Sequence, residues 1–268
     1  MKIIDAAYHP DHSNLDILKD LEQGNSDVVV LRNFLNPDEI QDLLQVFHNY
    51  NQYYQVYDGY IGFPRPFDHI PRNPQQDYDS ETKAYLQNMK HNNIGERFQA
   101  KLKTLSQSYH LQFNDTSRQI THSKTWSSMR ELALGKGYFE IHCGRLFQDW
   151  NKDYFDFFSG KADIDTQFAF LIVLQRPETD CDIEIFDLTW QNCDTKINKD
   201  FLQLKTGEKL RVQNIPSEKV VLMEGDVLVF NEGDYWHLVP PFIGEKPRIS
   251  FGGFMTKLKD NQNYLVWS

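Results

Sequence analysis

Two histidines stand in sequence contexts that could place them on a metal ion. His142 lies in GYFEIHCG, and His237 lies in LVFNEGDYWHLVPP, after a strand-like run and a turn. Residues two apart in a strand share a face, so we expect Glu140, His142 and Gly144 to point together into a barrel, with Phe139, Ile141 and Cys143 opposite. Either histidine alone would fit a structural role, but together they predict a metal site.

An arginine follows the second histidine at a defined spacing. Arg248 lies eleven residues after His237, in PRISFGG, and Ser250 shares its expected strand face. A guanidinium inside a barrel is costly unless a carboxylate neutralises it, and beside a hydroxyl it suits bidentate hydrogen bonding to a dicarboxylate. This order of residues is similar to that of iron(II)/2-oxoglutarate enzymes, in which two histidines and one carboxylate hold the iron.

A glycine stands where those enzymes normally place the carboxylate. The usual motif is His-x-Asp or His-x-Glu, but this chain reads His142-Cys143-Gly144. Glycine offers no ligand atom, so an external anion, most simply chloride, could take the position. We therefore interpret Gly144 as a halide site. The alternatives are a strand glycine at a bulge, or a hydroxylase or desaturase that uses two histidines only or recruits Glu140 as third ligand.

The C-terminal half of the chain resembles the free-standing iron(II)/2-oxoglutarate halogenases, especially those of hapalindole-type (welwitindolinone and ambiguine) alkaloids. The resemblance is carried by EIHCGRLF, QFAFLIVLQRPETDCDIEIFDLTWQ, EGDVLVFNEGDYWHLVPPFIGEKPRISFGGF and NYLVWS. It implies that His142 and His237 ligate iron. It also implies that Arg248, assisted by Ser250, pairs with the distal carboxylate of 2-oxoglutarate. Arg130 resembles an upstream arginine that contacts the cosubstrate or supports the halide region.

Two residues depart from the halogenase pattern. Ala169 falls where relatives carry a small polar residue near the active site, and Glu140 falls where they carry a small or apolar one. The missing hydroxyl at Ala169 bears on whether halide or hydroxyl is transferred. Glu140, His69 and Arg145 are candidate substrate contacts.

The activity implied by the resemblance is chlorination of an unactivated aliphatic carbon of a free small molecule, as part of natural product biosynthesis. Its cofactors are Fe(2+), 2-oxoglutarate and chloride or bromide, with O2 as cosubstrate and succinate and CO2 as coproducts. A hydroxylase on the same scaffold and a non-enzymatic metal-binding or ligand-binding relative are the alternatives. The sequence does not identify the substrate as an alkaloid, a nucleotide or an amino acid.

Composition limits the partners of the chain. Its net charge of −10 disfavours a nucleic acid polymer. Three cysteines without a Cys-x-x-Cys pair fit a reducing compartment, so we expect a cytoplasmic protein. No apolar run reaches the roughly 18 residues of a membrane span. No carrier-protein docking surface is evident.

The order of elements predicts an α+β fold in one iron/2-oxoglutarate oxygenase-type domain, 1–268. Residues 1–125 are expected to supply helices and a lid, packed on a double-stranded β-helix (jelly-roll, cupin-like) core at 126–268, where short strands alternate with turns. Asn36 and Pro37 are expected to begin a helix. The aromatic and proline-rich stretch 50–78 reads as a long loop or lid.

Overall fold

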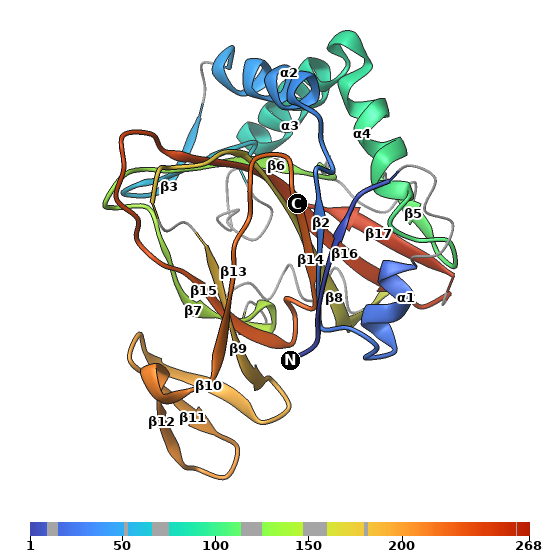
Figure 1. The fold of residues 1–268 in the computed structure, drawn as a ribbon. Helices are drawn as coiled ribbons and strands as arrows, with labels where there is room; N and C mark the ends of the chain where they lie inside the picture. The colour runs from blue at the N-terminus through green and yellow to red at the C-terminus, as the bar shows by residue number, and fades with distance from the viewer. Residues whose placement is uncertain are drawn as a thin grey trace.

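The computed structural model describes residues 1–9, 16–50, 53–65, 75–113, 125–146, 160–179, 182–260 and 262–268. Its architecture is mixed α+β and rich in strands (Figure 1). The helices are α1 (Ile17–Glu22), α2 (Pro37–His48), α3 (Gln75–Met89) and α4 (Ile94–Lys103), with 3-10 turns η2 (His91–Asn93), η3 (Gly144–Leu146) and η4 (Val212–Asn214). The strands are β1 (Ile3–Ala7), β2 (Val28–Arg32), β3 (Tyr54–Tyr57), β4 (Tyr60–Phe63), β5 (His110–Gln112), β6 (Ser128–Leu132), β7 (Phe139–His142), β8 (Ala162–Gln175), β9 (Ile183–Thr189), β10 (Cys193–Asn198), β11 (Phe201–Leu204), β12 (Lys209–Arg211), β13 (Ser217–Val220), β14 (Val227–Phe230), β15 (Tyr235–Val239), β16 (Arg248–Leu258) and β17 (Asn263–Trp267).

The strands form three sheets. The large sheet runs β1-β2-β14-β8-β16-β6-β4-β3, and β17 joins it by pairing with β16 and β5. The second sheet runs β13-β9-β15-β7, and β10-β11-β12 form a third. Strands β1 to β4, which belong to the part expected to be helices and lid, thus extend the same sheet as the C-terminal strands.

Both faces of the large sheet are buried, which explains the continuous apolar sequence of β2. Val29 packs in one cluster with Leu43 of α2 and Phe98 of α4, on the face that the helices cover (Figure 1). Val28 and Val30 pack in another cluster with Ile185 of β9, on the face turned toward the second sheet. The helices and the second sheet therefore enclose the large sheet from its two sides.

The start of α2 confirms the helix boundary expected at Asn36. The Asn36 side chain accepts a hydrogen bond from the Glu39 backbone N–H at 2.9 Å, and the Glu39 carboxylate accepts one from the Asn36 N–H at 2.8 Å. This capping box, with Pro37 at the first helical position, satisfies amides that have no partner within the helix.

The expectation that 50–78 forms a long loop is wrong for the residues described, while a role as a lid stays a prediction. Strands β3 and β4 form an antiparallel hairpin that pairs with β6. The signal was present, because Tyr54, Val56 and Tyr60 carry strand-forming side chains around an Asp58-Gly59 turn. Gly59 has φ +93, and an added Cβ would lie 2.7 Å from the Lys136 backbone, so only glycine fits the turn. Residues 51–52 and 66–74 lie outside the described part.

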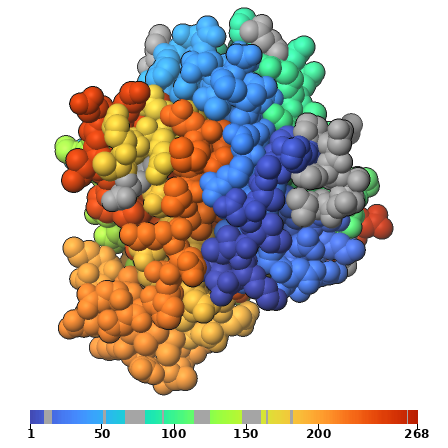
Figure 2. Space-filling model, in the orientation of Figure 1, coloured from blue at the N-terminus to red at the C-terminus, as the bar shows by residue number. Residues whose placement is uncertain are grey.

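The third sheet projects from the rest of the molecule. Figure 1 and Figure 2 show β10, β11 and β12 as a separate lobe at one end of the second sheet. Trp236 of β15 donates from its indole to the Cys193 carbonyl at 2.9 Å, which ties the lobe to the second sheet. No helix in the described ranges is long and apolar enough to cross a membrane.

A buried carboxylate at the start of β14 links that strand to β2. Asp226 is 2% exposed and accepts hydrogen bonds from the Arg32 guanidinium at 2.6 Å and from the Met223 N–H at 2.8 Å. We predict that Asp226→Ala lowers the free energy of unfolding by about 1–3 kcal/mol, because it removes a buried carboxylate and the charge-assisted hydrogen bonds that it accepts. Urea unfolding followed by tryptophan fluorescence measures this.

Asp5 provides the matched control, because it pairs with the same arginine at the surface. Asp5→Ala should cost less than about 1 kcal/mol. Equal losses of stability in the two variants would contradict the role given to Asp226.

Candidate active site

A cavity of about 550 Å³ lies between the large sheet and the second sheet. This volume is in the range of small-molecule sites. Apolar and aromatic side chains dominate its wall, and a few charged groups and two histidines interrupt them. Its lining residues are Tyr57, Asp58, Tyr60, Arg130, Leu132, Tyr138, Phe139, Glu140, His142, Ala169, Phe170, Leu171, Ile183, Lys196, Phe230, Glu232, His237, Val239, Arg248, Ser250, Gly253 and Phe254.

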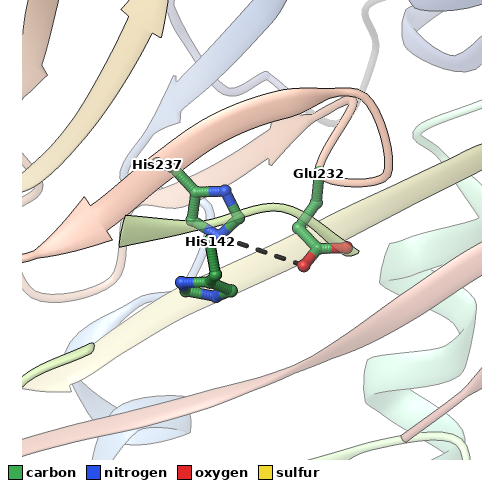
Figure 3. A group of neighbouring side chains, drawn as sticks. All are labelled: His142, Glu232 and His237. Atoms are coloured by element: carbon green, nitrogen blue, oxygen red, sulfur yellow. Dashed lines mark ion pairs between the residues drawn. The ribbon is translucent and has the colours of Figure 1, made fainter. Parts of the chain in front are cut away.

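The two predicted metal-binding histidines face each other on neighbouring strands. Antiparallel β7 and β15 pair His142 directly with His237. Directly opposed residues project from the same side of a sheet. Their imidazole centroids are 4.2 Å apart, and both rings line the cavity (Figure 3). The register of one strand pair therefore sets the distance between the rings.

Backbone hydrogen bonds orient both rings. His142 Nδ1 lies 2.7 Å from the Glu140 carbonyl, and His237 Nδ1 lies 3.0 Å from the Tyr235 carbonyl. A carbonyl only accepts, so Nδ1 carries a proton in both rings, and Nε2 is the nitrogen that remains for a metal. Burial, reinforced by neighbouring His142, holds the pKa of His237 well below its usual value, which favours the neutral ligand form.

A glutamate that sequence reasoning did not select completes this group. Glu232 lies in the turn between β14 and β15, is 3% exposed, and directs its carboxylate toward the histidines (Figure 3). Its Oε1 lies 3.9 Å from His237 Nε2, and one ligand atom from each of His142, Glu232 and His237 lies within 4.8 Å of the others. Two imidazoles and one carboxylate are a donor set that fits iron(II).

Gly144 lies next to Glu232 but not in the strand phase predicted for it. Strand β7 ends at His142, and Gly144 begins the 3-10 turn η3. The Gly144 N–H donates to the Glu232 backbone carbonyl at 2.9 Å. A Cβ at 144 would overlap Oε2 of Glu232 and lie 2.7 Å from Nε2 of Gln167. A turn, and not the strand β7, therefore places Gly144 beside Glu232 and the two histidines.

The predicted two faces of β7 are right except at Phe139. Ile141 and Cys143 are 1% and 0% exposed and pack away from the cavity, and burial raises the pKa of the Cys143 thiol. Phe139, however, lines the cavity. The pairing steps from His237/His142 to Val239/Phe139, so one extra residue of β7 bulges and reverses the phase.

The predicted cosubstrate residues lie on adjacent strands of the cavity wall. Arg248 and Ser250 of β16 are 1% and 5% exposed, and both line the cavity. Arg130 of β6 pairs in register with Ser250, and its guanidinium lies 5.6 Å from the Phe254 ring centroid. Ala169 of β8 lines the same cavity, where it contributes a methyl group and no hydroxyl.

Glu140 lines the cavity but lies outside the group of potential metal ligands. Its Oε2 accepts a charge-assisted hydrogen bond from Lys196 Nζ at 3.0 Å. Because Lys196 belongs to β10, the projecting lobe contributes a residue to the cavity wall. A Glu140-assisted metal site thus has no geometric support here, since Glu232 occupies the nearer position.

Arg145, another candidate substrate contact, is not among the residues that line the cavity. It is 8% exposed, and its guanidinium pairs with Asp165 at 2.9 Å. His69 lies outside the described residues. Sequence reasoning missed Glu232, Gln167 and Lys196. An acidic residue five positions before the second histidine was the available signal for the first of these.

Comparisons with known proteins give one family. The family model described as "Carrier-protein-independent halogenase WelO5" matches residues 4–268. A search of curated proteins found no significant match.

Solved structures resemble the chain at low identity. A 2OG-Fe(II) oxygenase family oxidoreductase from Burkholderia pseudomallei is 10% identical with TM-score 0.45, covering 97% of each chain. An N-substituted L-amino acid dioxygenase from Burkholderia ambifaria AMMD is 12% identical with TM-score 0.49, covering 93% of this chain and 90% of that one. The epimerase SnoN from nogalamycin biosynthesis is 12% identical with TM-score 0.47, covering 90% and 85%.

The paired histidines generate a direct prediction for metal binding. We expect His142→Ala and His237→Ala each to weaken cobalt(II) binding at least about 10–100-fold, because each removes a nitrogen ligand. Isothermal titration calorimetry in the absence of 2-oxoglutarate measures the affinity. His110→Ala, which changes an exposed histidine of β5, is the control and should bind cobalt as the wild type does. Retention of full affinity in either site variant would remove that histidine from the metal site.

Proposed function

Because the chain belongs to the family of carrier-protein-independent halogenases, we propose that it chlorinates an unactivated aliphatic carbon of a free small molecule. Family membership makes it a non-haem iron(II)/2-oxoglutarate-dependent oxidoreductase whose substrate is not tethered to a carrier protein. The observation that supports chlorination is the pairing of His142 with His237 beside a glycine instead of a carboxylate-bearing residue.

Different residues of the cavity would bind the metal and position the substrate. His142 and His237 would hold iron(II) through Nε2, and Glu232 is within reach of the same ion. The chemistry that iron supplies when bound is the oxidation, by O2, of 2-oxoglutarate to succinate and CO2, coupled to removal of hydrogen from a substrate carbon. The protein fixes which carbon lies near the halide and which groups surround it.

We assign the distal carboxylate of 2-oxoglutarate to Arg248. A guanidinium that is 1% exposed on a cavity wall is stabilised by an anion placed against it. Ser250, on the same strand face, adds a hydroxyl, and Arg130 lies on the neighbouring strand. This assignment leaves the aromatic part of the cavity for the substrate.

Aromatic side chains favour a flat or hydrophobic substrate. Tyr57, Tyr60 and Phe139 line the cavity, and the ring centroids of Tyr60 and Phe139 are 5.1 Å apart. The Lys196–Glu140 pair adds a polar element from the projecting lobe. Ala169 contributes no hydroxyl at its own position, so placement of the substrate carbon carries more of the choice between chlorine and hydroxyl transfer.

The sheet arrangement supports the expected core. We propose that the large sheet and the second sheet form a double-stranded β-helix, a jelly-roll of cupin type, with the helices packed outside it. The cavity between the sheets and their mainly antiparallel pairing agree with this assignment. A single domain over 1–268 and a cytoplasmic location stay predictions.

Glu232 favours a second candidate function, hydroxylation. A buried carboxylate beside two histidines restores the donor set of an iron/2-oxoglutarate hydroxylase. The products separate the two functions, since halogenation gives a chlorine isotope pattern and hydroxylation gives a gain of one oxygen.

Moving a carboxylate onto residue 144 tests the halide position. Wild-type enzyme, incubated with iron(II), 2-oxoglutarate, chloride and metabolite extracts, should give succinate and a product with a chlorine isotope pattern in mass spectrometry. The double variant Gly144→Asp with Glu232→Ala should lose chlorination and give hydroxylated product or none, because an aspartate would fill the halide position. Glu232→Ala alone is the control and should still chlorinate. Unchanged chlorinated product from the double variant would exclude a halide beside Gly144.

Arg248→Lys tests the cosubstrate site. A lysine keeps the charge but loses the bidentate geometry, so we expect 2-oxoglutarate to bind about 10–100-fold more weakly, equivalent to about 1.5–3 kcal/mol. Titration of 2-oxoglutarate into the anaerobic iron enzyme measures the affinity. Arg211→Lys, at an exposed position of β12, should bind it normally. An unchanged affinity in Arg248→Lys would place the distal carboxylate elsewhere.

A further inference from the structure

The space that a side chain at residue 144 would occupy is filled by the Glu232 carboxylate. An added Cβ at Gly144 would overlap Oε2 of Glu232 and would lie 2.9 Å from its Cδ. The carboxylate that the His-x-Gly motif lacks is therefore replaced in space by one from the turn before β15. A side chain at residue 144 would therefore require the Glu232 carboxylate to move.

The position of this carboxylate is built into the fold at two points. The Gly144 N–H donates to the Glu232 carbonyl at 2.9 Å, which fixes the backbone of the turn against η3. Gln167 Nε2 donates to Glu232 Oε2 at 2.8 Å, and both side chains are buried, at 5% and 3% exposed. The other oxygen, Oε1, lies 3.9 Å from His237 Nε2.

A halide at the position beside Gly144 and the Glu232 carboxylate exclude each other. Both are anions, and both require the volume over the glycine Cα. Gln167 serves either one, because its amide N–H groups donate to a carboxylate oxygen or to a halide. The carboxylate is the end of a flexible side chain, so it can leave this volume without movement of the backbone.

We propose that Glu232 is an internal anion at the metal centre that halide must displace, and that this exchange determines whether the enzyme halogenates. The inference rests on the proposed halogenase function. With the carboxylate in place, the donor set is that of a hydroxylase. With the carboxylate displaced, the position beside Gly144 is open to chloride. Gln167 is a positioning residue, since it acts through Glu232.

Cobalt(II) binding and chloride titration test the exchange without turnover. In halide-free sulfate buffer, Glu232→Gln and Glu232→Ala should bind cobalt(II) about 10–100-fold more weakly than wild type. Chloride, followed by the visible absorption of bound cobalt, should bind about tenfold more tightly to Glu232→Ala if the carboxylate holds the position about nine-tenths of the time in the wild type. The gain should be smaller in Glu232→Gln, because its amide lacks the charge but keeps the volume. Glu218→Gln removes an exposed carboxylate of β13 and should change neither affinity. Melting temperatures confirm that each variant is folded.

Two outcomes overturn the proposal. Equal cobalt and chloride affinities in wild type and both Glu232 variants would show that the carboxylate does not act at the metal. Weaker cobalt binding without any chloride response in wild type or variant would make Glu232 a fixed ligand. The proposed halogenase function fails separately, when wild-type product carries no chlorine although cobalt and chloride titrate as expected.

Discussion

The register between β7 and β15 is the constraint on which the candidate site depends. It sets His142 directly opposite His237, and a slip by one residue would turn one imidazole to the other face of the sheet. The carbonyls of Glu140 and Tyr235, each two residues before a histidine, then fix the tautomers. The position, orientation and tautomer of both rings thus follow from backbone geometry.

The large sheet provides the opposite wall of the site under a different constraint. Its central strands are buried on both faces, so most of their residues are apolar, and a charged residue there needs a reason. Arg248 is such a residue, with Ser250 and Arg130 beside it on the cavity face. The cavity therefore has cationic side chains on the wall formed by the large sheet and the two potential metal ligands on the wall formed by the second sheet.

The sequence predicted those features that local patterns of residue type encode. The apolar strands, the cap at Asn36 and the inward phase of His142 and Arg248 follow from local patterns, and the structure has them. The alternation of residues between the two faces of a strand is interrupted at bulges and turns, which is why the sequence misplaced Phe139 and Gly144. Glu232 was missed for the same reason, because a turn residue has no face until its neighbours are known. Lys196 depends on how the β10–β12 lobe docks, which no local pattern encodes.

Among the described strands, β7 is an edge of its sheet and pairs with β15 on one side, in the order β13-β9-β15-β7. An ion held by His142 and His237 would cross-link this edge to its neighbour, so a bound metal would also stabilise the strand pair. Without the ion, only backbone pairing with β15 holds this edge, and unpaired edge backbone is open to hydrogen exchange and to pairing with other chains. The same two side chains would then serve both the chemistry and the integrity of the sheet.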